Sequence, residues 1–190
     1  MEQTAAVLLR EIEARSGMEG PFLIAVDGRC ASGKTTLAAY IQRQTGCQVV
    51  HMDDFFLRPE QRTEERLTEP GGNVDWERFR EEVLLPLSRG EKALVRPYDC
   101  HAKKLGEPVT VMPDLVTVVE GSYSCHPRLW DFYHMHIFLS IDPAEQLRRI
   151  EKRNGKAALE VFRDKWIPLE ERYFETFHIA QRCICLEFQT

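Results

Sequence analysis

The segment from Gly28 to Thr35, GRCASGKT, has the spacing of a loop that binds the phosphates of a nucleoside triphosphate. Its glycines let backbone N–H groups approach phosphate oxygens without an intervening Cβ. Lys34 can place a mobile cation on the β- and γ-phosphates and act in catalysis, and the Thr35 hydroxyl can hold Mg²⁺. We therefore expect ATP and Mg²⁺ as cofactors. The expected ATP-binding residues here are Gly28, Arg29, Cys30, Ala31, Ser32, Gly33, Lys34, Thr35 and Thr36.

Carboxylates follow two of the apolar runs. Asp53 and Asp54 come after CQVVHM, and Glu120 ends DLVTVVE. Asp53 could accept a proton from a substrate hydroxyl or hold Mg²⁺ through water, and a helix cap or a solvated turn is the alternative. A carboxylate at the position of Glu120 would lie beside a dry core, which favours a metal or cation role.

Arg149 and Arg153 stand four residues apart in a charged stretch, so a helix would place them on one face. In a phosphotransferase, such a pair can stabilise the negative charge that spreads during transfer. A solvated charged helix is the alternative. Phe56, next to Phe55, could pack in the core or line a pocket for a flat ring, and the pattern does not separate the two.

Apolar periodicity predicts the elements that must position these residues. Strands are expected over 21–28, 47–54, 114–121, 134–141 and 182–188. Helices are expected over 3–16, 34–44, 75–87 and 143–155, followed by helix to residue 178 with a break before Pro168. Residues 57–74 read as a loop or mobile flap, and 93–112 as two small strands around a polar loop. The alternation of strands and helices predicts an α/β fold with a mostly parallel sheet, helices on both faces, and ligands at the carboxyl ends of the strands.

The composition fits one domain over residues 1–190. A net charge of −5 argues against a general nucleic-acid or membrane-surface binder, and the apolar runs are shorter than the ~20 residues of a membrane span. The beginning of the chain does not read as a signal peptide. Six cysteines without a CxxC pair indicate reduced thiols and a cytoplasmic protein, and they disfavour a zinc site at Cys100–His101 and Cys125–His126.

An ordered set of motifs resembles the uridine kinase family. VDGRCASGKTT, HMDDFF, NVDWERF, RPYDC and VTVVEG occur here in that family's order. The family is similar to the nicotinamide riboside, pantothenate and phosphoribulose kinases. The resemblance covers residues 20–188. It implies a three-layer P-loop kinase fold with a five-stranded sheet, a small β insertion with the substrate pocket near 55–112, and a helical lid near 143–170.

The resemblance also implies roles for single residues. Asp53 falls on the catalytic base, and Thr35 and Glu120 fall on magnesium-associated positions. Asp75 matches a residue that grips ribose, and Arg149 and Arg153 match lid arginines. Tyr98 and Asp99 match a pocket motif. The uridine kinases carry a histidine a few residues beyond the motif tyrosine, whereas His101 is closer to Tyr98 and Lys103 falls nearer that place.

These patterns predict an ATP- and Mg²⁺-dependent kinase for the primary hydroxyl of a small molecule, with uridine or another ribonucleoside as the favoured acceptor. The acceptor-binding residues expected are Asp53, Phe56, Asp75, Tyr98, Asp99 and His101, and the metal-associated ones Thr35, Asp53 and Glu120. A kinase for nicotinamide riboside or a vitamin precursor is the alternative within this class. A nucleotide-binding regulatory protein or switch is the alternative of another class. The pattern leaves the oligomeric state and the preferred phosphate donor open.

Overall fold

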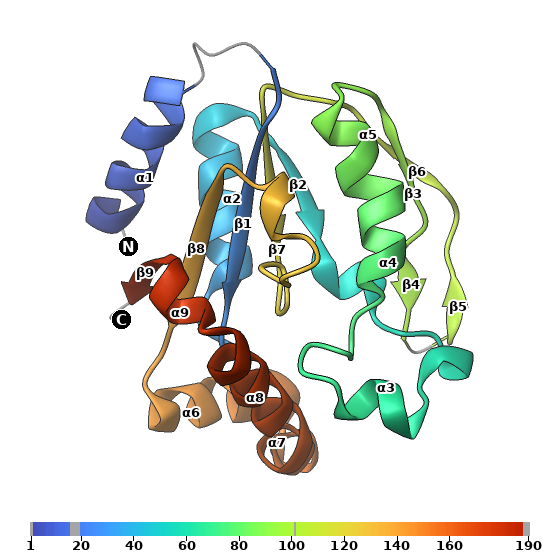
Figure 1. The fold of residues 1–190 in the computed structure, drawn as a ribbon. Coiled ribbons are helices and arrows are strands. Elements are labelled where there is room, and N and C mark those ends of the chain that lie inside the picture. Colours follow the sequence, from blue (N-terminus) through green and yellow to red (C-terminus); the bar gives the residue numbers. More distant parts are fainter. Residues whose placement is uncertain (1, 16–19, 101, 188–190) are drawn as a thin grey trace.

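A five-stranded parallel sheet forms the middle layer of the computed structural model, which describes residues 2–15, 20–100 and 102–187 (Figure 1). Its strand order is β2-β7-β1-β8-β9, and every neighbouring pair is parallel. The predicted parallel sheet is confirmed. The strands are β1 (Phe22–Gly28), β2 (Gln48–His51), β7 (Val116–Glu120), β8 (Met135–Ser140) and β9 (Ile184–Glu187).

Strand β1 is buried on both of its faces, as its continuous apolar run predicts. Leu23 and Ala25 belong to one hydrophobic cluster, and Ile24 and Val26 belong to a second. Successive side chains of a strand point to opposite faces, so the two clusters are the two cores on either side of the sheet.

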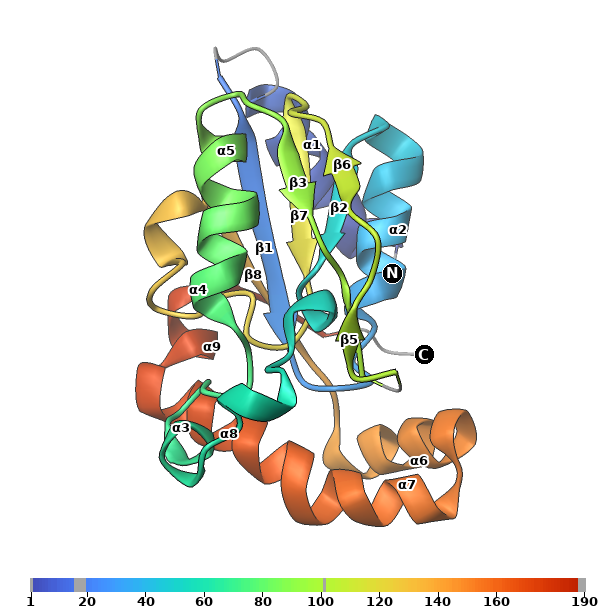
Figure 2. The ribbon, with the colours of Figure 1, turned by 90° about the vertical axis from the view of Figure 1, so that its right-hand side faces the viewer.

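Helices cover both faces, as predicted (Figures 1 and 2). On one face lie α1 (Glu2–Arg15) and α2 (Lys34–Thr45), which bury Ile12 and Leu37 among others. On the other lie α4 (Trp76–Phe79), a π-helical turn (Arg80–Leu84) and α5 (Leu85–Ser88), joined in the same core by α8 (Ile167–Phe177) and α9 (Ile179–Arg182). None of the helices within the described ranges has the length and apolar composition needed to cross a membrane.

Two small antiparallel strand pairs extend from the second face of the sheet. β3 (Ala93–Val95) pairs with β6 (Val109–Val111), and β4 (Tyr98–Asp99) pairs with β5 (Lys104–Leu105). The sequence predicted one such pair around a polar loop, and the structure has a second pair inside that loop.

Residues 57–74 are more ordered than the predicted loop. They contain a 3₁₀ turn (Pro59–Gln61) and the short helix α3 (Glu64–Thr68). The Thr63 hydroxyl accepts a hydrogen bond from the Arg66 N–H at 3.1 Å, which caps α3. The Arg66 guanidinium donates to the carbonyls of Gly72 and Val74 and so ties α3 to the C-terminal end of this segment. These polar contacts order the segment. They leave no apolar periodicity in the sequence, which is why the sequence predicts a loop.

The predicted break before Pro168 does not occur. Helices α6 (Pro143–Asn154) and α7 (Lys156–Val161) are separated at Gly155, but a π-helical turn (Phe162–Trp166) joins α7 to α8 with helical dihedral angles throughout. Likewise, the π-helical turn Arg80–Leu84 comes directly before α5, whose second residue is Pro86. Proline lacks an N–H and crowds the preceding turn, and a wider turn there accommodates it without ending the helix.

Candidate active site

The motif residues meet in one pocket at the carboxyl ends of the central strands. The phosphate loop follows β1, Glu120 ends the neighbouring β7, and Asp53 follows β2 at the outside of that pair. The pocket has a volume of about 740 Å³. It is lined by Cys30, Ala31, Gly33, Lys34, Thr35, Thr36, Asp53, Phe56, Arg62, Asn73, Cys100, Glu120, Ser122, Tyr123, Arg149, Arg153, Phe162, Trp166 and Glu170. These residues therefore lie at the edge of the sheet where the rule for parallel strands predicts ligands.

The backbone of the phosphate loop requires glycine at its first position. Gly28 has φ 136°, and a Cβ there would lie 2.1 Å from the carbonyl oxygen of Leu139 on β8. The Arg29 N–H donates to that same carbonyl at 3.1 Å. Ala31 and Gly33 are also left-handed, so the loop changes hand repeatedly before α2 begins at Lys34. Such alternation forms the concave backbone nests that bind anions.

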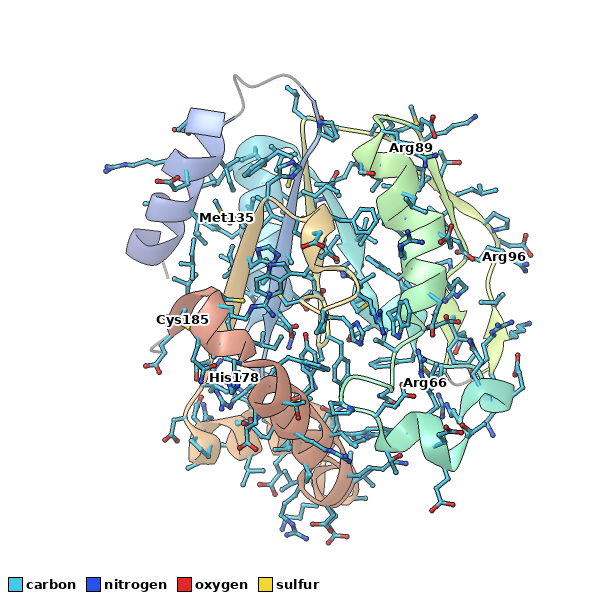
Figure 3. All side chains as sticks on the ribbon, in the orientation of Figure 1. Arg66, Arg89, Arg96, Met135, His178 and Cys185 are labelled. Carbon is cyan, nitrogen blue, oxygen red and sulfur yellow. The ribbon has the colours of Figure 1, made fainter. Side chains whose placement is uncertain are left out.

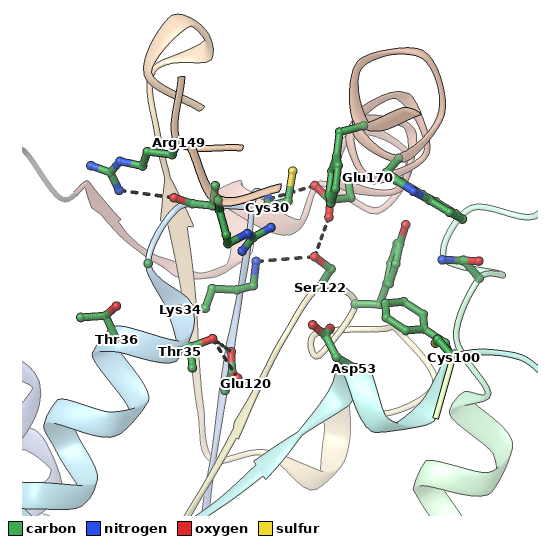
Figure 4. A pocket seen from close by; sticks show the side chains of 18 of the residues that line it. Cys30, Lys34, Thr35, Thr36, Asp53, Cys100, Glu120, Ser122, Arg149 and Glu170 are labelled. Carbon is green, nitrogen blue, oxygen red and sulfur yellow. Dashed lines mark hydrogen bonds between the residues drawn. The ribbon is translucent and has the colours of Figure 1, made fainter. Parts of the chain in front are cut away.

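The Lys34 ammonium is folded onto its own loop. It donates to the carbonyls of Gly28 at 2.7 Å and Arg29 at 3.0 Å, and it lies 3.5 Å from the Ser122 hydroxyl (Figure 4). These partners are neutral oxygens, which phosphate oxygens can replace with a stronger, charge-assisted bond. Lys34 therefore lines the pocket beside the phosphate loop, within reach of a triphosphate bound there.

Thr35 and Glu120 form the expected oxygen pair. The Thr35 hydroxyl lies 3.2 Å and 3.3 Å from the two carboxylate oxygens of Glu120 (Figure 4). The Nδ1 atom of His51 lies 2.6 Å from the same carboxylate, whose hydrogen bond raises the pKa of His51. Glu120 is only 5% exposed, so its charge is screened little by water.

These donors fit Mg²⁺, which prefers oxygen ligands and is held by one or two carboxylates together with substrate phosphates and water. Within the described ranges, no group of three or more histidine, cysteine, aspartate or glutamate side chains is arranged to hold a metal ion by itself. A magnesium site that is completed by the phosphates of the nucleotide does not need three such protein side chains. Thr35 and Glu120, with Asp53 nearby in the pocket, would hold the ion together with the triphosphate.

Asp53 is the second residue of the 3₁₀ turn Met52–Phe55, which follows β2, and its side chain faces the pocket (Figure 4). The surrounding walls displace water and raise the pKa of Asp53, the Lys34 cation opposes that shift, and the carboxylates of Glu120 and Glu170 add to it. A carboxylate of raised basicity accepts a hydroxyl proton more readily than an ordinary aspartate does.

Arg149 and Arg153, which the resemblance predicts as lid arginines, both line the pocket. Arg149 donates from Nη1 to the carbonyl of Ala31 at 3.3 Å and from Nε to Glu145 at 2.7 Å (Figure 4). The Nε of Arg153 donates to the Asn154 side chain at 2.7 Å. Helix α6 thus brings two guanidinium groups beside the phosphate loop.

Ser122 and Glu170 belong to the site but were missed by the sequence interpretation. The Ser122 hydroxyl donates to one oxygen of Glu170 at 2.6 Å, and the Cys30 N–H donates to the other at 3.0 Å (Figure 4). Ser122 lies two residues past Glu120, so the edge rule could have found it. Glu170 lies on α8 among other charged residues, and no sequence signal separates it from a solvated one.

Of the residues predicted to bind the acceptor, Asp53 and Phe56 line the pocket and three others do not. Asp75 is buried, caps α4 by accepting from the Arg78 N–H at 3.1 Å, and accepts from Gln61 at 2.8 Å. Tyr98 is buried on β4, and the exposed Asp99 accepts from the Ala102 N–H. His101 lies outside the described residues. Acceptor contacts for Asp75, Tyr98, Asp99 and His101 stay predictions.

No protein-family model matches the chain. The chain is 33% identical over 145 residues to uridine kinase-like protein 3 of Arabidopsis thaliana. That match covers 70% of this chain and only 31% of the relative, so the chain spans about a third of the length of this curated protein.

Solved structures with the same fold include one described as a possible uridine kinase from Bacillus stearothermophilus. It has a TM-score of 0.73, 20% identity, and coverage of 98% of this chain and 100% of that one. D-glycerate 3-kinase from Cryptococcus neoformans has a TM-score of 0.63, 17% identity, and coverage of 90% and 87%. The P-loop kinase fold and the resemblance to the uridine kinase family are confirmed.

Proposed function

We propose that this chain, which resembles the uridine kinases and has the P-loop kinase fold, is an ATP- and Mg²⁺-dependent kinase that phosphorylates a hydroxyl group of a small molecule. One observation carries the proposal. A phosphate loop, a threonine–glutamate pair suited to Mg²⁺ and an aspartate of raised pKa line the same pocket.

The chemistry follows from that arrangement. Lys34 exchanges its loop carbonyls for phosphate oxygens, and Arg149 and Arg153 add positive charge from the lid. Magnesium, when bound, neutralises charge on the β- and γ-phosphate oxygens. Asp53 orients the acceptor hydroxyl and takes its proton as the new O–P bond forms and the bond to ADP breaks. Positioning and electrostatics supply most of the rate, because phosphoryl transfer through a loose transition state needs little covalent help.

A regulatory nucleotide-binding protein is the competing function. Such a switch needs a triphosphate site but no space for an acceptor. The pocket continues past the phosphate loop to Asp53, Phe56, Asn73 and Trp166, which favours an enzyme. Within the kinase class, the resemblance implies a ribonucleoside such as uridine, with nicotinamide riboside and vitamin precursors as the alternatives.

The expected compartment is the cytoplasm. All six cysteines are free thiols, including Cys125 and Cys183, whose sulfur atoms lie 3.9 Å apart. Unbonded sulfurs at this spacing favour a reducing environment.

The test is ADP release from ATP and Mg²⁺ with uridine, nicotinamide riboside, pantothenate or D-glycerate as acceptor. We expect one acceptor class to raise ADP release well above background, and Lys34→Ala to lower both the rate and ATP affinity. Lys92→Ala, which changes an exposed lysine outside the pocket, is the matched control. Tight ATP binding without stimulation by any acceptor would support the regulatory function instead, and a fully active Lys34→Ala would refute the role of the loop.

A further inference from the structure

The acceptor end of the pocket contains an arginine that nothing so far explains. Arg62 lies in the segment between β2 and α4, and its side chain lines the pocket. The same pocket is also lined by Asp53, Phe56, Asn73, Cys100, Tyr123 and Trp166, beyond the phosphate loop. Apart from Asp53, these lining residues are aromatic or neutral.

Arg62 is held in place by the backbone of its own segment. Its N–H donates to the carbonyl of Pro59 at 3.3 Å, and its Nε donates to the carbonyl of Leu57 at 2.9 Å. The Nε bond fixes one edge of the exposed guanidinium, which also forms a hydrogen bond with the Cys100 thiol. An arginine pre-oriented in this way loses less side-chain entropy when it binds an anion.

No carboxylate of the described residues forms an ion pair with Arg62. Its neighbours in sequence behave differently. Arg66 pairs with Glu77 at 2.7 Å, and Arg78 pairs with Glu82 at 3.2 Å, and neither of these arginines lines the pocket. Unlike Arg66 and Arg78, Arg62 lines the pocket and has no carboxylate partner among the described residues.

Arg62 and Asp53 flank the same space. Burial raises the pKa of the Cys100 thiol, the Arg62 guanidinium lowers it, and the Asp53 carboxylate raises it. Cys100 therefore lies within electrostatic range of both groups. An acceptor whose hydroxyl reached Asp53 would extend towards Arg62.

The other acidic groups of this region are already engaged. Asp75 caps α4 and accepts from Gln61, while Asp99 accepts from the Ala102 N–H outside the pocket. Glu120 and Glu170 face Thr35, Ser122 and the phosphate loop. A neutral polyol such as ribose is usually gripped by spare carboxylates, whereas this end of the pocket offers a spare cation and the Asn73 amide.

We propose that the acceptor is a small hydroxylated anion whose carboxylate or phosphate group binds Arg62 while its hydroxyl faces Asp53. This inference rests on the proposed kinase function and replaces the ribonucleoside by an anionic acceptor. Arginine forms paired, charge-assisted hydrogen bonds with either anion. The γ-phosphoryl group passes from ATP to the hydroxyl oxygen and leaves ADP, the hydroxyl proton passes to Asp53, and the carboxylate or phosphate group held by Arg62 is unchanged by the reaction.

The first experiment compares acceptors that share hydroxyl groups and differ in charge. Glycerol, D-glycerate, glycerol 3-phosphate and uridine are assayed for ADP release with the wild-type chain. We expect D-glycerate or glycerol 3-phosphate to give a kcat/KM at least about 10-fold above glycerol and uridine, because one charge-assisted contact is worth that much. The two anions distinguish a carboxylate from a phosphate acceptor.

The second experiment uses Arg62→Gln with the preferred anion. We expect its KM for the anion to rise about 10- to 100-fold, with the KM for ATP unchanged, and Arg62→Lys to recover part of the loss. Arg89→Gln is the matched control, since Arg89 is exposed at the far end of α5 (Figure 3). Preference for uridine or glycerol, or equal KM values in Arg62→Gln and wild type, would overturn the inference and leave the kinase function standing. No stimulation by any acceptor would count against the kinase function itself.

Discussion

At the scale of single residues, Asp53 is exposed to the pocket, whereas two of its partners in the proposed transfer are buried. Its carboxylate faces the pocket, whereas Glu120 and Lys34 are nearly buried and already bonded to neighbours. Its pKa is raised by the surrounding walls and lowered by the Lys34 cation. This position suits a group that must meet an incoming hydroxyl, while the groups proposed to hold phosphate and metal are already bonded to their neighbours.

Asp53→Asn tests this role. The amide cannot accept the hydroxyl proton, so we expect turnover to fall by about 10²- to 10⁴-fold while ATP affinity changes little. Turnover is measured by ADP release and affinity by calorimetry. The adjacent Asp54→Asn is the control, because Asp54 does not line the pocket. Equal turnover in the two variants would exclude Asp53 as the base.

At the scale of elements, α8 is bound directly to the phosphate loop. Glu170 accepts from the Cys30 N–H and the Ser122 hydroxyl, and Glu171 pairs with Arg29 through two bonds of 2.6 Å and 2.9 Å. The π-helical turn that precedes α8 places Phe162 and Trp166 at its ends, and both line the pocket. Helix α8 therefore helps to hold the phosphate loop and one wall of the pocket in place.

Glu170→Ala tests that connection. The change leaves a buried N–H and a buried hydroxyl without their acceptor, which costs about 1–3 kcal/mol of unfolding free energy. Glu175→Ala, on the exposed side of the same helix, is expected to change stability by less than about 0.5 kcal/mol. Urea titration measures both. A Glu170→Ala chain as stable as Glu175→Ala would show that the contact contributes nothing.

At the scale of the whole molecule, the fully buried Asp27 joins three distant segments. It accepts hydrogen bonds from the N–H groups of Gly28, Tyr123 and Cys125 and from the Tyr173 hydroxyl, all between 2.7 Å and 3.1 Å. These donors belong to the phosphate loop, the loop after β7 and helix α8. Burial raises the pKa of Asp27 to about 6 against the opposing effect of these hydrogen bonds.

Asp27→Asn removes the acceptor capacity of one carboxylate oxygen, so we expect a loss of about 2–5 kcal/mol at pH 7.5. The pH dependence has a definite sign. A folded-state pKa above the unfolded value means that the native chain binds the extra proton as pH falls, so wild type gains stability relative to the variant. The gain is about 1 kcal/mol between pH 7 and pH 5.

Thermal unfolding of wild type and Asp27→Asn at neutral pH and at pH 5 measures the loss of stability and its dependence on pH. Asp131→Asn, at an exposed position, is the control. A difference between wild type and Asp27→Asn that shrinks as the solution becomes more acidic would contradict the raised pKa.

The sequence by itself determined the phosphate loop, the parallel sheet and the edge at which Asp53 and Glu120 lie. Loop spacing and strand periodicity are local properties, and the topology of parallel strands then brings their carboxyl ends together. The helices after residue 143 were predicted too, apart from the continuation through Pro168.

Only the tertiary structure decided which polar side chains face the pocket. Glu170 lies 140 residues from Cys30 and looks like any charged helix residue until α8 packs on the loop. The sequence does not show that Asp75 is already hydrogen-bonded by Gln61 and Arg78. It also does not show that the exposed Arg62, held by the Leu57 carbonyl, lines the pocket. A charged side chain has the same local pattern whether water or protein surrounds it, so its role is fixed by packing between segments distant in sequence.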